Sequence, residues 1–219
     1  MTGDAPSDWD KRQEIVDACR RMNALGINQG RSGNISCRVT NGLLVTPSGL
    51  DHDAMQPGDI VLMDADGGVR DGQLKPSSEW RFHCVILAAR PEIGAVVHTH
   101  AMFATVLACH RREIPAFHYM VAAAGGNSIR CAPYATFGTP ELSENALTAL
   151  DGRRACLLAN HGMIALGETL DGALALAVEV ETLAAQYCRA LALGEPALLP
   201  AREMETVLEK FKTYGKQDG

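Results

Sequence analysis

Two histidines end the apolar run Ala95-Val96-Val97-His98-Thr99-His100. The small and β-branched residues that precede them predict a short buried strand. Side chains two positions apart on a strand share a face and lie about 7 Å apart, so the imidazoles of His98 and His100 can converge on one ion while Thr99 points away. A lone His-x-His pair is more often two edge histidines without a ligand, so a metal site requires further ligands.

Two further candidate ligands flank this strand in the sequence. Glu79 lies upstream in Ser77-Ser78-Glu79, and His161 lies downstream in Asn160-His161-Gly162. Three neutral imidazole nitrogens and one carboxylate form a familiar ligand set for zinc, a borderline-soft cation. Spacing along the chain does not by itself bring the four residues together, so the metal centre is a hypothesis about the tertiary structure.

Three polar segments have the composition of anion-binding turns. The loop Asn28-Gln29-Gly30-Arg31-Ser32-Gly33-Asn34 can expose backbone N–H groups, as a nest does. Thr46-Pro47-Ser48-Gly49 directly follows a predicted strand, and Lys75-Pro76-Ser77-Ser78-Glu79 precedes a predicted helix whose N-terminus favours a phosphate. Each segment taken alone is better explained as an ordinary turn or helix N-cap, with Glu79 on the surface.

Length and composition predict a single globular domain over residues 1–219, with flexible ends at 1–9 and 215–219. The net charge of −6, without a basic stripe, argues against nucleic acid as a partner. The N-terminus does not resemble a secretory signal and no apolar stretch could span a bilayer, so we expect a cytoplasmic protein without a membrane partner. The seven scattered cysteines are typical of buried thiols in a reducing compartment.

Helical and strand patterns alternate along the chain. Asn41-Gly42 is a hairpin signal between predicted strands at 35–39 and 43–45, and Asp66-Gly67-Gly68 is another after the predicted strand at 59–63. Residues 114–120 predict a further strand or extended segment, and 155–159 a buried strand. Helical patterns cover about 9–25, 79–89, 101–109, 169–192 and 203–211, with another helix beginning after Thr139. This order predicts an α/β, three-layer fold in which helices flank a central, mainly antiparallel sheet.

Several long runs of this sequence are similar to one known family. They include Pro76-Ser77-Ser78-Glu79-Trp80-Arg81-Phe82-His83, Ile114-Pro115-Ala116-Phe117-His118-Tyr119-Met120 and Ala132-Pro133-Tyr134-Ala135-Thr136-Phe137-Gly138-Thr139. Through these runs, and through Leu208-Glu209-Lys210-Phe211-Lys212-Thr213-Tyr214-Gly215, the chain resembles the class II aldolase/adducin family over roughly residues 10–215. Such runs are far more specific than any short motif.

The resemblance implies a zinc enzyme with one Zn²⁺ per subunit. Such an enzyme cleaves a ketose 1-phosphate, such as L-fuculose 1-phosphate, reversibly into dihydroxyacetone phosphate and an aldehyde such as L-lactaldehyde, by way of an enediolate. By position, the metal ligands would be His98, His100 and His161, with Glu79 as the fourth ligand in the resting site. Thr99 stands where the family leads us to expect an asparagine.

The resemblance also assigns substrate-binding and catalytic roles. Glu79 would transfer a proton to and from the enediolate, and Tyr119 from a neighbouring subunit would serve the C4 oxygen. Phe137 and Tyr214 correspond to residues on the aldehyde side and in the C-terminal tail, although ordinary packing also explains them. The phosphate would be held by Gly33, Asn34, Ser48, Gly49, Ser77 and Ser78, with Ser48 replacing an expected threonine.

Other functions of the same scaffold compete with the aldolase. Pentulose-phosphate 4-epimerases typically carry aspartate where this chain has Glu79, which favours the aldolase, whereas dehydratases and decarboxylases are harder to exclude. A non-catalytic, adducin-like scaffold would have lost the metal histidines, which this chain retains. The resemblance further implies a homotetramer with active sites at the subunit interfaces and a small sugar phosphate as the ligand.

Overall fold

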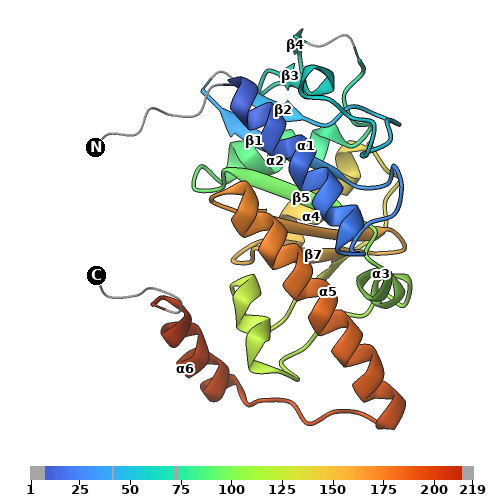
Figure 1. Ribbon diagram of the computed structural model, residues 1–219. Helices are drawn as coiled ribbons and strands as arrows, with labels where there is room; N and C mark the ends of the chain where they lie inside the picture. The colour runs from blue at the N-terminus through green and yellow to red at the C-terminus, as the bar shows by residue number, and fades with distance from the viewer. Residues whose placement is uncertain (1–7, 41, 72–73, 214–219) are drawn as a thin grey trace.

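A computed structural model describes residues 8–40, 42–71 and 74–213 of the chain (Figure 1). Its centre is an eight-stranded sheet with the order β4-β3-β2-β1-β5-β8-β7-β6. Every neighbouring pair is antiparallel except β6 and β7, which are parallel. The strands are β1 (Asn34–Val39), β2 (Gly42–Val45), β3 (Val61–Met63), β4 (Val69–Asp71), β5 (Ala95–Thr99), β6 (Cys131–Ala132), β7 (Ala155–Leu158) and β8 (Gly162–Gly167).

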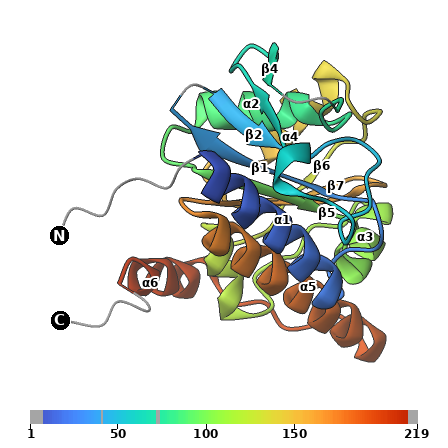
Figure 2. The ribbon, with the colours of Figure 1, turned by 45° about the horizontal axis from the view of Figure 1, so that its top comes forward.

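Helices cover both faces of this sheet and give the three layers. On one face α1 and α5 lie side by side, as both ribbon views show, and α3 packs beside α5 (Figures 1 and 2). On the other face α2 packs against α4. The helices are α1 (Asp8–Ala24), α2 (Trp80–Ala89), α3 (Met102–Cys109), α4 (Pro140–Ala149), α5 (Leu170–Leu193) and α6 (Ala201–Phe211). The predicted fold class, a mainly antiparallel sheet between helical layers, is confirmed.

Strand β5 shows how the sheet divides the core. Ala95 and Val97 are buried with the side chains of α1, α3 and α5, whereas Val96 is buried with those of α2 and α4. Because side chains alternate along a strand, His98 shares the face of Val96, toward α2. The strand lies between β1 and β8, with Asn34 opposite His98 on one side and Ile164 opposite His98 on the other.

Two strand predictions were wrong in part. Residues 114–120 do not form a strand: Ile114 makes a single bridge with Ile129, and Tyr119–Ala124 form a 3₁₀ helix, η2, whose N-cap His118 accepts from the Met120 N–H. The chain turns directly after this bridge, because the Phe117 N–H donates to the carbonyl of Pro115 rather than to a neighbouring strand. The strand predicted at 59–63 begins only at Val61, because Pro57–Asp59 form a short 3₁₀ turn, η1.

The N-terminal end of the described chain is helical, and the C-terminal end packs on the 3₁₀ helix η2. Asp8 and Trp9, predicted as part of a flexible end, lie in α1, while residues 1–7 and the predicted flexible tail at 215–219 lie outside the described residues. The C-terminal α6 packs against η2. Among the described helices, none combines the length and the apolar character that a membrane crossing requires.

Candidate active site

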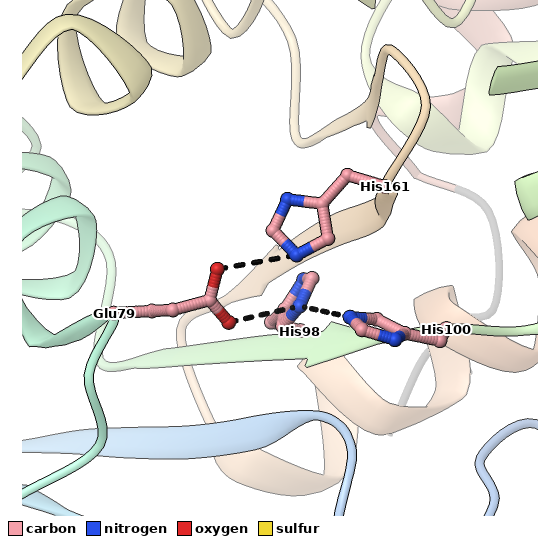
Figure 3. Close-up of side chains that lie close together, drawn as sticks. All are labelled: Glu79, His98, His100 and His161. Carbon is pink, nitrogen blue, oxygen red and sulfur yellow. Dashed lines mark hydrogen bonds and ion pairs between the residues drawn. The ribbon is translucent and has the colours of Figure 1, made fainter. Parts of the chain in front are cut away.

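Four potential metal ligands that are distant in the sequence meet at one end of β5 (Figure 3). Glu79 is the N-cap residue of α2, His98 lies on β5, His100 follows the end of that strand, and His161 lies in the turn between β7 and β8. Their ligand atoms all lie within 4.8 Å of one another, and Figure 3 shows the imidazole rings and the carboxylate pointing toward a common centre.

The hydrogen bonds of the cluster favour a cation at its centre. Nδ1 of His98 lies 2.9 Å from the carbonyl of Met163, which can only accept, so Nδ1 donates and Nε2 keeps its lone pair. That Nε2 lies 3.2 Å from Oε2 of Glu79, which is itself an acceptor. Two acceptors at this distance repel each other unless a proton or a metal ion lies between them. A carbonyl partner on the far nitrogen is also the usual way in which a metal-binding histidine is oriented.

The remaining contacts of Glu79 lead to the same conclusion. Its Oε1 is buried without a hydrogen bond, although Nε2 of His161 lies 3.2 Å away. Burial raises the pKa of Glu79, but positive charge and N–H donors at the adjacent His98 and His161 lower it by more, so positive charge at this point holds the pKa of Glu79 well below its usual range. Burial, followed by the neighbouring histidines, lowers the pKa of His100 to about 4. An ionised carboxylate among neutral imidazoles is the donor set that a divalent metal requires.

Gly162 allows the turn that carries His161 to approach β5 closely. A Cβ atom at this position would lie 2.5 Å from the carbonyl oxygen of Thr99 and 3.0 Å from Cδ2 of His100. Just before it, Asn160 adopts φ 55°, a left-handed conformation that asparagine tolerates better than most residues. The close turn therefore depends on the residue types in Asn160-His161-Gly162.

We expect Gly162→Ala to weaken metal binding by about tenfold or more, the scale on which residues that orient metal ligands act. The added methyl group forces β8 and His161 away from His98 and His100. Titration of the metal-free protein with zinc against a competing chelator measures the effect. Gly58→Ala is the matched control, because a Cβ there meets no atom within 4 Å. Equal zinc affinity in the two variants would contradict this role for Gly162.

The candidate metal ligands open onto a cavity of about 310 Å³. Glu79, His100 and His161 line it, whereas His98 is fully buried behind them. The six residues predicted to bind phosphate all line this cavity, as does Phe137. Residues that the sequence analysis did not assign to the site also line it: Arg31, Ser32, Pro47, Tyr134, Ala135 and Asn160.

Backbone pairing brings the three polar segments together. An isolated bridge joins Pro47 to Pro76, so the Ser77 N–H donates to the carbonyl of Thr46 and the Ser48 N–H donates to that of Lys75. The loop before β1 joins them through Gly33, whose backbone has φ +72° and would place a Cβ only 2.7 Å from the carbonyl of His98. A larger residue at Gly33 would therefore separate this loop from the metal cluster.

Arg31 brings a positive charge to the same cavity. The Arg31 side chain is exposed, and its Nη1 lies 3.4 Å from the carbonyl oxygen of Gly49, which also lines the cavity. Arg31 was predicted only as part of a polar loop, although a guanidinium beside serine hydroxyls is suited to a phosphate.

Asn34 and the two predicted tyrosines occupy different surroundings. The Asn34 side chain is buried and donates from Nδ2 to Oε2 of Glu79 at 2.9 Å. Tyr119 is 46% exposed on η2 and lines a second cavity, together with residues of α6, that does not include the metal cluster. Tyr214 lies outside the described residues. Within one chain the structure thus groups Glu79 with the histidines and the polar turns, but not with Tyr119.

Comparison with known proteins shows similarity over nearly the whole chain. The family model described as "Class II Aldolase and Adducin N-terminal domain" matches residues 13–188. A 5-methylthioribulose-1-phosphate/5-deoxyribulose-1-phosphate aldolase from Rhodospirillum rubrum is 63% identical over 93% of this chain and 92% of its own length. An L-fuculose phosphate aldolase from Escherichia coli K12 is 51% identical over 93% of this chain and 94% of its own.

A solved structure agrees with these relatives in fold. The structure titled "L-fuculose 1-phosphate aldolase" superposes with a TM-score of 0.91 at 44% identity, covering 95% of this chain and 98% of the other. Class II aldolases are metal-dependent, and the described residues of this chain hold a Glu79-His98-His100-His161 group that can bind a metal. From the family match, the level of identity and the shared fold, this chain belongs to the class II aldolase/adducin family.

Proposed function

We propose that this protein is a zinc-dependent aldolase that cleaves a ketose 1-phosphate reversibly into dihydroxyacetone phosphate and an aldehyde. One observation carries the proposal: a Glu-His₃ cluster lies in the same cavity as three polar turns suited to a phosphate. The three imidazoles favour zinc over harder cations such as Mg²⁺, which prefer oxygen ligands. The seven cysteines are all unpaired, which supports a reducing cytoplasm as the compartment.

The relatives narrow the substrate class. The Rhodospirillum rubrum relative is named for 5-methylthioribulose 1-phosphate and 5-deoxyribulose 1-phosphate, and the Escherichia coli relative for L-fuculose phosphate. The sugars in these names share a terminal carbon without a hydroxyl group. We propose a 5-deoxy- or 5-methylthio-pentulose 1-phosphate as the preferred substrate, because the relative named for these is the more similar of the two, with L-fuculose 1-phosphate as a further substrate. The apolar side chain of Phe137, 63% exposed beside the cavity, suits such a terminus.

The chain's own residues supply binding and proton transfer. The phosphate lies against the turns and the N-terminus of α2, held by Gly33, Asn34, Ser48, Gly49, Ser77 and Ser78. His98, His100 and His161 would hold a metal ion, which would supply Lewis acidity for the charge that develops on the substrate oxygens. Glu79 takes up a proton from solvent and adds it to the enediolate carbon in cleavage, and it removes a proton from that carbon in synthesis.

Tyr119 completes the reaction from a second subunit in this proposal. Cleavage of the C3–C4 bond requires loss of the C4 hydroxyl proton, which a tyrosine positioned there can accept as the phenolate and return as the phenol. Tyr119 lines a different cavity from Glu79 and is half exposed, which fits a side chain that serves the site of a neighbouring copy. We therefore propose a homotetramer with sites at the subunit interfaces, with Phe137 and Tyr214 near the aldehyde.

A substrate panel tests the proposal. Purified, zinc-loaded protein is assayed for release of dihydroxyacetone phosphate from 5-deoxyribulose 1-phosphate, 5-methylthioribulose 1-phosphate and L-fuculose 1-phosphate. We expect release from all three, with kcat/KM highest for the pentulose phosphates. Zinc-loaded protein that releases nothing from any of them would overturn the aldolase assignment and favour an epimerase or decarboxylase of the same scaffold.

A further inference from the structure

A buried chain of hydrogen bonds runs from the side chain of Glu79 into the core. Nδ2 of Asn34 lies 2.9 Å from Oε2 of Glu79, and Oδ1 of Asn34 lies 2.6 Å from Nε2 of His83. Nδ1 of His83 lies 2.7 Å from Oγ of Ser36. Asn34 and Ser36 share one face of β1, two residues apart, and His83 stands on α2 one turn after Glu79.

The chemistry of the groups sets one direction for these hydrogen bonds. The carboxylate of Glu79 can only accept, so Asn34 turns its amide N–H toward it. The amide oxygen of Asn34 then faces His83 and requires a donor, so Nε2 of His83 carries the proton. Nδ1 of His83 is left as an acceptor for the Ser36 hydroxyl. All three bonds therefore donate toward Glu79, and reversing any one of them would place two acceptors together.

Burial makes this chain of bonds rigid. His83 and Ser36 are fully buried, and Asn34 is 6% exposed. Water therefore offers no substitute partner, and an unpaired polar group at any of these positions would be costly. Burial lowers the pKa of His83 to about 3, so its ring stays neutral and holds one proton. The ring of Phe82 packs against His83 with centroids 4.5 Å apart and restricts its rotation.

We propose that His83 is a positioning residue for the aldolase reaction, acting through Asn34 to hold the Glu79 carboxylate where it exchanges a proton with the substrate. This inference rests on the proposed function and extends it to a residue that touches neither metal nor substrate. Its Nε2–H fixes the orientation of the Asn34 amide, and the amide N–H fixes one oxygen of Glu79. Without that donor the buried amide oxygen of Asn34 has no partner, and the amide no longer holds the carboxylate in one position.

Two substitutions at position 83 separate positioning from packing. Glutamine places an amide N–H near the position of Nε2 and can still donate to Asn34, whereas asparagine reproduces only the Nδ1 side, toward Ser36. We expect His83→Asn to lower kcat by about 10- to 100-fold with little change in KM or zinc content, and His83→Gln to retain kcat within a few-fold of the wild type. Both variants remove the same ring, so their melting temperatures should be similar.

The result that would overturn the proposal is a loss of kcat that is equal in the two variants, or wild-type kcat in His83→Asn. If both variants fail to fold, Ser36→Ala provides the kinetic test, because it leaves Nδ1 of the buried His83 without its donor and the ring held by Asn34 alone. A partial fall in kcat is then expected, and an unchanged kcat would count against the proposal.

A spectroscopic measurement tests the direction of the bonds without any aldolase assay. Protein labelled with ¹⁵N-histidine is studied by NMR, and the His83 signals are assigned by their absence in His83→Gln. We expect one set of His83 signals, with the proton on Nε2 and an unprotonated Nδ1 throughout pH 6–8. A proton on Nδ1 would overturn the proposed direction. If that measurement succeeds while the wild type shows no aldolase activity, the proposed function fails and the positioning of Glu79 stands.

Discussion

Removal of the metal with a chelator is expected to lower dihydroxyacetone phosphate release by at least about 1000-fold, because Lewis-acid stabilisation of developing oxygen charge contributes several kcal/mol and each 1.4 kcal/mol is a factor of ten. No lysine or arginine among the described residues of the cavity can replace the charge of the metal. Arg31 lines the cavity but lies with the polar turns, beside Gly49. The measurement is a coupled assay on dialysed protein whose zinc content has been determined.

Restoration of the metal provides the control for this experiment. Addition of one equivalent of zinc per subunit should return activity in full, and unchanged circular dichroism before and after chelation would show that the fold survives. Mg²⁺ should restore little, because the cluster offers three imidazoles and one carboxylate rather than a set of oxygen ligands. Full turnover by protein shown to be free of metal would disprove the metal-dependent mechanism.

Replacement of Glu79 by glutamine is expected to lower kcat by about 10²- to 10⁴-fold, the usual contribution of a positioned acid–base group. Glutamine has nearly the same size and can still present an oxygen to the Asn34 N–H, but it cannot accept the proton that the carboxylate carries. Steady-state kinetics measures the effect, and the zinc content of the protein is determined in parallel in the absence of substrate.

Phosphate binding separates loss of chemistry from loss of the site in this variant. Calorimetric titration with inorganic phosphate should give similar affinity in Glu79→Gln and in the wild type, since the polar turns are unchanged. The three histidines should keep zinc in the variant, at reduced affinity. Wild-type turnover in Glu79→Gln would remove this residue from the mechanism, and loss of both zinc and phosphate binding would show that the substitution disrupts the site instead.

Local sequence patterns predicted much of the site. The period of two along a strand placed His98 and His100 on one face, and the polar turns at 28–34, 46–49 and 75–79 were recognisable by composition. The Thr139 N-cap and the long helix α5 followed from side-chain chemistry and periodicity, and the structure confirms both, with Thr139 Oγ1 accepting from the Leu142 N–H. These features depend only on near neighbours, which a sequence displays directly. The family resemblance then supplied the roles of residues that periodicity could not group.

Tertiary pairing decided the rest. His161 reaches β5 because β8 pairs with that strand, setting Thr99 opposite Met163, and because Gly162 admits the close turn. The buried chain from Glu79 through Asn34 to His83 was not foreseen, and His83 was not among the predicted site residues. Glu79 and His83 lie 45 and 49 positions after Asn34 in the sequence. Which strands pair, and which helix covers them, depends on burying both faces of one sheet at once, and no local pattern encodes that choice.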